Sequence, residues 1–149
     1  MYTTIVVGTD GSATATKAVH RAAAIAAGLG AELHLVTAHK PSGAAAIAGA
    51  EAGFAGVHRA EWDAELRGQL TGALQELINE LAAGGVKTSG RVVDGHPVAA
   101  LLDAAKALDA GLIVVGNKGM KGARRMLGSV PNDVAHKAEC DVLIVNTTG

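Results

Sequence analysis

Five short apolar runs alternate with helical patterns along this chain of 149 residues, and this alternation constrains the fold more than any other feature. The runs are rich in Val, Ile and Leu and are predicted as strands at 4–7, 33–38, 86–93, 112–115 and 142–145. Between them, apolar residues recur with helical spacing at 15–29, 59–83, 98–108 and 132–138. Strands that alternate with helices and are apolar on both faces form a parallel sheet covered on both sides. The sequence therefore predicts an α/β fold, a doubly wound five-stranded parallel sheet.

The length and the loops predict one domain and a strand order. A hydrophobic content of 49% supplies a proper core, so a single folded domain, 1–149, is expected. In doubly wound sheets, ligands bind beyond the carboxyl ends of the strands, where the winding reverses. The loops with usable chemistry follow the first and the fourth strand. If they share one site, these two strands are neighbours and the strand order is 3-2-1-4-5.

Composition excludes several classes of function. Aromatic residues make up 2% of the chain and the net charge is -1, so neither stacking platforms nor general attraction to nucleic acid is expected. No apolar run is long enough to span a bilayer and no leader opens the chain, so a cytoplasmic location is expected. Cys140 stands alone and is expected to be a small buried residue. The six histidines lack zinc-ligand spacing, so no metal site is predicted.

The middle of the chain is predicted as a long mobile loop, 40–57, followed by the helix 59–83. The inner face of that helix is predicted to consist of Trp62, Leu66, Leu70, Ala73, Leu74, Leu77, Ile78 and Leu81. The next helix follows the turn Gly95-His96-Pro97. Its inward residues are predicted to be Val98, Leu101, Leu102, Ala105 and Leu108.

A glycine-rich, basic loop, 116–131, leaves the fourth strand and enters the last helix. Backbone N–H groups approach an anion closely only where no Cβ intervenes, and a helix N-terminus adds unpaired donors. The loop is therefore predicted to cradle phosphate, with roles for Gly116, Lys118, Gly119, Gly128 and Ser129. In the alternative interpretation the glycines are turn and cap residues, and Ser129 caps the helix. The spacing matches neither a Walker loop nor the dinucleotide fingerprint.

The loop after the first strand reads Gly8-Thr9-Asp10-Gly11-Ser12. Asp10 is predicted to face the crevice, where a carboxylate could bind a ribose hydroxyl, an adenine amino group or a phosphate-bound metal. The alternative is a turn or helix-capping aspartate. His39, at the end of the second strand, is expected near the pocket rather than in its lining.

Taken together, these motifs resemble the universal stress protein family over the whole length. The resemblance includes Gly8-Thr9-Asp10-Gly11-Ser12, the Gly95-His96-Pro97 turn, Gly128-Ser129-Val130-Pro131 and the final strand. It implies the five-stranded fold predicted above, of the adenine nucleotide alpha hydrolase-like type. The nucleotide-binding branch of the family holds ATP with a Gly-x-x-Gly-x(9)-Gly-Ser/Thr loop. Here eight residues, 120–127, separate the second and third glycines, so the loop is one residue shorter.

The resemblance also implies which residues bind the nucleotide. Asp10 and the backbone of Ala38 would face adenine and ribose, beside Gly8 and Thr9. Ribose and phosphates would be held by Gly116, Gly119, Gly128, Ser129 and Val130, and Lys118 of the basic loop is expected to join them. The expected ligand is ATP with Mg²⁺, or another adenine nucleotide such as cyclic AMP.

The function expected on this basis is that of a cytoplasmic, dimeric stress-response sensor or regulator, with an unknown regulatory protein partner and no membrane or nucleic acid. It is not expected to be an enzyme: no residue is assigned a catalytic role, although slow ATP hydrolysis stays open. A ligand-free dimeric interaction protein of the same fold is the alternative. The apolar fifth strand, 142–145, is expected to lie at the sheet edge and to pair with its copy in a homodimer.

Overall fold

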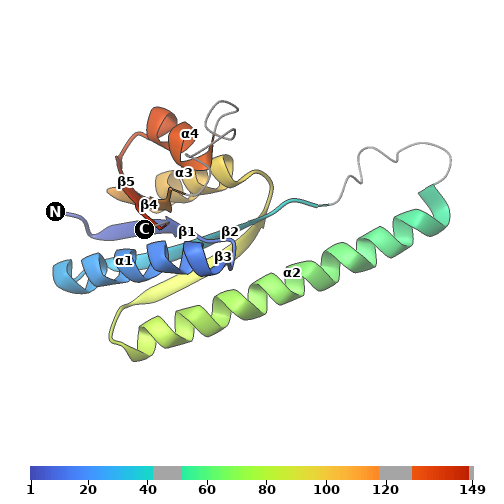
Figure 1. Cartoon of the computed structure of the whole chain (residues 1–149), viewed down its shortest axis with the longest axis horizontal. Coiled ribbons are helices and arrows are strands. Elements are labelled where there is room, and N and C mark those ends of the chain that lie inside the picture. Colours follow the sequence, from blue (N-terminus) through green and yellow to red (C-terminus); the bar gives the residue numbers. More distant parts are fainter. Residues whose placement is uncertain (42–51, 118–128, 148–149) are drawn as a thin grey trace.

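The computed structural model describes residues 1–41, 52–117 and 129–147. Within these ranges, strands and helices alternate along the chain (Figure 1). The strands are β1 (Thr4–Gly8), β2 (Glu32–His39), β3 (Thr88–Asp94), β4 (Leu112–Gly116) and β5 (Asp141–Val145). The helices are α1 (Ala13–Leu29), α2 (Ala52–Ala83), α3 (Pro97–Ala107) and α4 (Val130–Lys137).

The strands form one parallel sheet with the order β3-β2-β1-β4-β5, so the predicted fold class and strand order are confirmed. In the centre, Val6 of β1 lies beside His34 of β2 and Ile113 of β4. The winding reverses between β1 and β4. The carboxyl ends of these two strands therefore diverge into loops on opposite faces, which opens a crevice between them.

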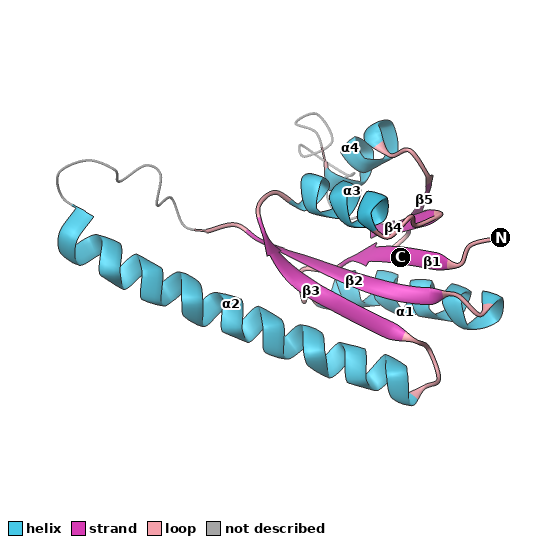
Figure 2. Ribbon diagram, turned by 180° about the vertical axis from the view of Figure 1, so that it is seen from behind, coloured by secondary structure: helices cyan, strands magenta, loops and turns pink. Residues whose placement is uncertain are grey.

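Helices cover both faces of the sheet (Figure 2). On one face α1 and α2 enclose a core that includes Ile5, Leu35 and Val114. On the other face α3 and α4 cover a second core around Val6 and Ile113. Strands buried on both faces need apolar residues throughout, which explains the continuous Val, Ile and Leu runs of β1 and β4.

Three helices begin at residues that cap their free N–H groups. Ser12 and Ser129 accept hydrogen bonds through their side chains from Ala15 and Asn132, and His96 accepts one from Val98. The helix-capping role considered for Ser129 in the sequence is thus confirmed, and Ser12 has the same role at the start of α1. Helix α1 ends at Gly30, whose φ of 64° lies in the left-handed region that glycine adopts without strain.

Helix α2 corrects two predictions. It starts at Ala52, so the predicted loop 40–57 is wrong for its last part, while 42–51 lie outside the described residues. Its first turns run beyond the edge of the sheet (Figure 1). Trp62 is therefore 67% exposed and Leu66 38% exposed, and Ala73 is exposed as well. Only the second half of the predicted inner face has a sheet to pack against.

Two smaller expectations also change. Leu108 follows the last turn of α3 and is 36% exposed, because it is the cap residue rather than part of the inner face. Cys140 is partly rather than fully buried, at the border of the second core.

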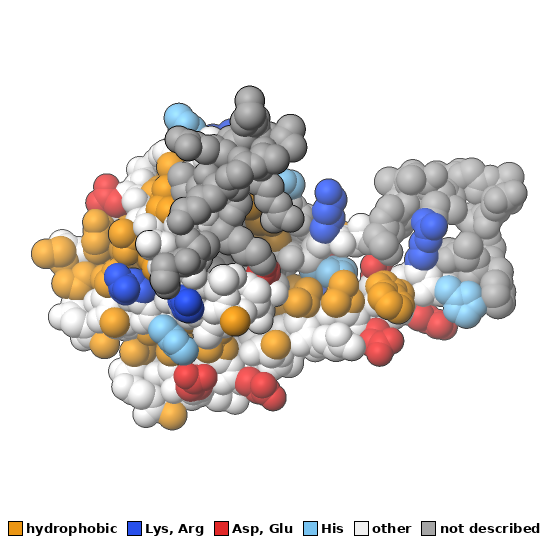
Figure 3. Space-filling model, viewed as in Figure 1, with side chains coloured by type: hydrophobic (Ala, Val, Ile, Leu, Met, Phe, Trp, Pro, Cys, Tyr) orange, Lys and Arg blue, Asp and Glu red, His pale blue; other side chains and the backbone are white. Residues whose placement is uncertain are grey.

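Hydrophobic side chains are visible along α2 in the space-filling view, beyond the part of the helix that the sheet covers (Figure 3). No helix within the described ranges is long and apolar enough to cross a membrane.

Candidate functional site

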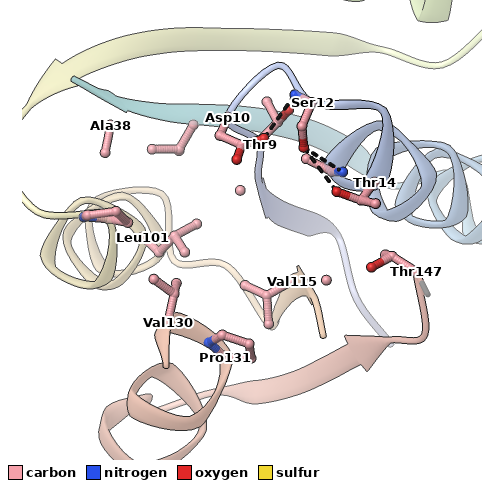
Figure 4. Close-up of a pocket in the computed structure, with 15 residues that line it drawn as sticks. Thr9, Asp10, Ser12, Thr14, Ala38, Leu101, Val115, Val130, Pro131 and Thr147 are labelled. Atoms are coloured by element: carbon pink, nitrogen blue, oxygen red, sulfur yellow. Dashed lines mark hydrogen bonds between the residues drawn. The ribbon is translucent and has the colours of Figure 1, made fainter. Parts of the chain in front are cut away.

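A cavity of about 290 Å³ lies at the carboxyl ends of β1 and β4, where the winding of the sheet reverses. We call it the switch-point cleft. Residues from both predicted loops line it, together with the ends of β2 and α3 (Figure 4). Six of the ten residues predicted to bind the ligand are in its lining: Gly8, Thr9, Asp10, Ala38, Gly116 and Val130. Clefts of this size and position are where α/β proteins bind small molecules.

The β1–α1 loop forms one wall of the cleft. The Asp10 carboxylate accepts a hydrogen bond from the Ser12 N–H at 2.9 Å, and Thr9 Oγ1 accepts one from the Gly11 N–H at 3.1 Å. These bonds are those of the turn interpretation, and they hold the loop in place. Asp10 is nevertheless exposed and lines the cleft. It therefore has both of the roles that the sequence left open: it stabilises the turn and it faces the crevice.

The floor of the cleft is apolar. Val36 of β2, Val115 of β4 and Leu101 of α3 line it from three directions. A Cβ placed on Gly8 would lie 3.2 Å from both methyl groups of Leu101, so glycine leaves the space between β1 and α3 open. The sequence assigned Leu101 to the helix core only. Leu101 reaches the cleft because α3 packs beside β1, and that arrangement depends on the strand order.

The start of α4 forms the opposite wall, with Val130 and Pro131 in the lining. Ser129 is 9% exposed, and its hydroxyl accepts a hydrogen bond from the Asn132 N–H at 3.3 Å. It lies directly beside the lining without belonging to it. Lys118, Gly119 and Gly128 lie outside the described residues.

The C-terminal tail supplies a cleft residue that the sequence analysis missed. Thr147 is 1% exposed and lines the cleft beside Gly116. Its N–H and its hydroxyl both donate to Oδ1 of Asn117, at 2.9 and 3.0 Å. A Cβ on Gly116 would lie 3.0 Å from the Thr147 methyl group, so this glycine allows the tail to pack closely. Gly116 and Thr147 come together because Gly116 pairs with Val145 in the sheet, and this register cannot be read from either segment alone.

His39 lies close to the cleft but on the other face of the sheet. It is 4% exposed, and its Nδ1 lies 3.0 Å from the Asp94 carboxylate, which also accepts from Arg67 of α2. The hydrogen bond from His39, and next the charge of Arg67, hold the pKa of Asp94 below its ordinary value. This cluster joins α2 to the ends of β2 and β3. It is outside the cleft lining, as the sequence analysis expected.

Comparison with known proteins identifies the class. Residues 1–146 match the Universal stress protein family. The chain belongs to this family, and its five-stranded sheet shares the fold of solved universal stress protein structures.

Individual relatives match over nearly the whole chain. Universal stress protein Rv1636 of Mycobacterium tuberculosis is 40% identical over 153 residues, covering 99% of this chain and 98% of the relative. A crystal structure of a universal stress protein in complex with cAMP is 37% identical, with a TM-score of 0.73 and coverage of 99% and 98%. UspA from Lactobacillus plantarum has a TM-score of 0.80 at 23% identity, which shows the shared fold, with coverage of 97% and 98%.

Proposed function

We propose that the switch-point cleft binds an adenine nucleotide and that the protein acts as a dimeric stress-response sensor or regulator in the cytoplasm. The observation that carries this proposal is the convergence of two loops, far apart in the sequence, on one cleft with an apolar floor and polar walls. An adenine nucleotide has the matching parts: a flat, weakly polar base, a ribose with hydroxyl groups, and an anionic phosphate.

Each part of the nucleotide has a suitable surface in the cleft. The base would lie on Leu101, Val36 and Val115, beside the backbone of Ala38. Asp10 would accept hydrogen bonds from ribose hydroxyls. Phosphate would lie at the start of α4, where Val130 is in the lining and the helix dipole favours an anion. We include Gly119, Gly128 and Lys118 among the nucleotide-binding residues because of the sequence motif alone.

Two adenine nucleotides are candidates. Cyclic AMP is supported by the relative at 37% identity that was crystallised with it. ATP is supported by the glycine spacing of the loop 116–131. Within residues 1–41, 52–117 and 129–147, no group of three or more His, Cys, Asp or Glu side chains could hold a metal ion. Mg²⁺ would therefore enter mainly through the phosphates of ATP, and cyclic AMP would need none.

Thermal unfolding with added nucleotide tests the proposal. At 100 times the dissociation constant, a ligand specific for the folded state raises the free energy of unfolding by about 2.7 kcal/mol. For a domain of this size we expect the melting temperature to rise by roughly 5–10 °C. The assay compares cyclic AMP, AMP, ADP and ATP, with and without Mg²⁺, and GTP is the control for base recognition.

Absence of a shift with every adenine nucleotide at millimolar concentration would contradict the proposal. It would favour the alternative of a ligand-free interaction protein with the same fold. Native mass spectrometry of freshly purified protein adds an independent test, because a co-purified nucleotide appears as a defined mass increase.

The proposed role is regulatory rather than catalytic. Among the described residues that line the cleft, Asp10 is the acidic one, and its carboxylate already accepts the Ser12 N–H. An enzyme of this kind needs a base placed against the attacking water. Slow ATP hydrolysis remains the alternative, and release of phosphate above the buffer rate would support it. The regulatory partner that reads the bound state is unknown.

We also propose a homodimer formed through β5. This strand is the outer one next to β4, and Val142, Leu143 and Ile144 are only partly buried. An apolar edge strand with free backbone groups favours pairing with a second copy. An antiparallel pair about a two-fold axis would bring the middle residue, Leu143, close to its own copy.

Leu143→Lys should therefore convert a dimer into a monomer, because two like charges would meet across the pair. Sedimentation at micromolar concentration measures the mass, and circular dichroism checks the fold. Leu66→Lys is the matched control: it replaces a leucine that is 38% exposed on α2, away from the edge. Val145→Lys is unsuitable, since Val145 is 5% exposed and belongs to the core, whereas Leu143 packs against that core but is only partly buried. A monomeric parent protein would contradict the dimer, and a dimeric Leu143→Lys variant would contradict this edge.

A further inference from the structure

One residue at the end of β4, Asn117, ties the C-terminal tail to the sheet. Its Oδ1 atom accepts hydrogen bonds from the N–H and from the hydroxyl of Thr147, at 2.9 and 3.0 Å. Its Nδ2 atom donates to Oδ1 of Asn146 at 3.1 Å, and its backbone N–H donates to the Val145 carbonyl at 2.9 Å. We call these four hydrogen bonds between Asn117 and residues 145–147 the tail clamp.

The partners of Asn117 fix the orientation of its side-chain amide. The Thr147 N–H can only donate, so the atom that faces it must be the amide oxygen, and the amide nitrogen then faces Asn146. The side chain thereby continues the β4–β5 ladder beyond its last pair, Gly116 with Val145. Asparagine supplies both a donor and an acceptor here, whereas alanine supplies neither.

Thr147 is a buried part of the cleft wall. It is 1% exposed and lines the switch-point cleft (Figure 4). A Cβ on Gly116 would lie 3.0 Å from the Thr147 methyl group and 3.8 Å from Cβ of Ala18 on α1. The Thr147 carbonyl accepts a long hydrogen bond, 3.4 Å, from Nζ of Lys17, also on α1. The tail therefore completes the wall of the cleft where β4 and α1 meet.

Asn117 is also the residue from which the glycine-rich loop leaves the sheet. It directly precedes residues 118–128, which lie outside the described residues and include Lys118, Gly119 and Gly128 of the sequence motif. Pairing of β4 with β5 holds the backbone of Asn117, and the side-chain bonds hold it further. A segment that starts from a fixed residue has less conformational freedom to lose when a ligand binds, so less of the binding free energy is spent on ordering it.

We propose that Asn117 and Thr147 are positioning residues of the nucleotide site, and that the tail clamp and the bound nucleotide stabilise each other. This inference rests on the proposed function, because it concerns the same cleft. Asn117 acts through the start of the phosphate-binding segment, and Thr147 acts through the wall beside Gly116. Coupling between two equilibria is reciprocal, so a clamp that strengthens nucleotide binding must itself be strengthened by the nucleotide.

Isothermal titration of the full chain with cyclic AMP, and with ATP and Mg²⁺, measures one side of this coupling. Asn117→Ala removes the three side-chain hydrogen bonds of the clamp and should weaken nucleotide binding by at least roughly tenfold. Asn79→Ala is the matched control, because Asn79 is an exposed asparagine of α2 whose side chain bonds to Gln75 away from the cleft. The control should bind like the parent.

Two substitutions at Thr147 separate hydrogen bonding from packing. Thr147→Val keeps the shape of the side chain but loses the hydroxyl that donates to Asn117, so nucleotide binding should weaken by roughly threefold to fivefold. Thr147→Ser keeps the hydroxyl and loses the methyl group beside Gly116, and it should bind within about twofold of the parent. If the tail acted by packing alone, the serine variant would be the weaker binder.

Hydrogen exchange of the Thr147 amide measures the other side of the coupling. Saturating nucleotide should slow this exchange in the parent by about the same factor by which Asn117→Ala weakens binding, because the coupling is reciprocal. A residue that only stabilised the fold would leave the exchange rate independent of the nucleotide. This measurement uses the parent protein, so it decides the question even if a variant folds poorly by circular dichroism.

Two results would overturn the proposal. One is a folded Asn117→Ala variant that binds nucleotide with the affinity of the parent. The other is exchange at the Thr147 amide that stays the same when nucleotide saturates the parent. Failure of the parent itself to bind any adenine nucleotide is a distinct outcome: it contradicts the proposed function, and this inference is then wrong with it.

Discussion

Gly8→Val should abolish adenine nucleotide binding while leaving the fold intact. A Cβ at this position meets the two Leu101 methyl groups at 3.2 Å, and the valine methyl groups would extend further into the cleft floor. Leu101 is the flexible end of a side chain, so the protein can adjust, but the slot proposed for the base is filled. Valine also suits a strand better than glycine does. We expect the nucleotide affinity to fall at least roughly a hundredfold, which corresponds to about 2.7 kcal/mol.

Isothermal titration with the nucleotide that gives the largest thermal shift measures this loss, and circular dichroism with thermal unfolding checks the fold. Gly72→Val provides the matched control, since a Cβ at Gly72 on α2 has nothing within 4 Å. That control should bind like the parent. If Gly8→Val bound nucleotide with unchanged affinity, the base could not lie on Leu101, and the assignment of the cleft would be wrong.

Gly90→Val should be the most destabilising of the glycine substitutions. Gly90 lies in β3 beside Leu35 of β2 and beneath Ile78 of α2. A Cβ here would lie 2.8 Å from the Leu35 carbonyl oxygen and 3.2 Å from the Ile78 methyl group. Backbone in the middle of a sheet cannot move away as a side-chain end can. Overpacking of this kind costs about 3 kcal/mol, and the melting temperature should fall by roughly 6–12 °C.

Chemical denaturation of Gly90→Val and of the parent gives the difference in the free energy of unfolding. The same Gly72→Val variant serves as its control, because an exposed helix position with open space should change stability by less than about 0.5 kcal/mol. Equal stability of Gly90→Val and the parent would mean that β3 and α2 separate easily.

The fold was predictable because its signals are local. The apolar runs of β1 and β4, the caps at Ser12 and Ser129, and Gly30 at the end of α1 each act within a few residues. Strand order followed from one further assumption, that two chemically active loops share a site. The sheet has that order, and the two loops meet in one cleft.

Errors arose where burial depends on a distant element. The periodicity of α2 places Trp62 and Leu66 on the same stripe as Leu70 and Leu74. Periodicity defines a face but says nothing of what the face meets, and the sheet ends before the helix does. Those first two residues are therefore exposed, and only the later part of the stripe is buried.

The cleft residues likewise divide into those that the sequence predicted and those that it missed. Asp10, Gly8 and Gly116 were singled out because strand-end glycines and acids have a local meaning. Thr147 and Leu101 were missed because nothing in their own neighbourhood marks them. They reach the cleft through the register of β5 on β4 and the crossing of α3 over β1.

By itself, the sequence determined the α/β class, the alternation of strands and helices, the helix caps and the loops that meet in the cleft. It could do so because hydrophobic periodicity and turn chemistry are properties of short segments. Only the tertiary structure decided the exposure of the α2 stripe and the hydrogen bonds between Asn117 and Thr147. Each of these depends on which segments lie side by side. That is set by packing of the whole chain, so no local window of the sequence carries it.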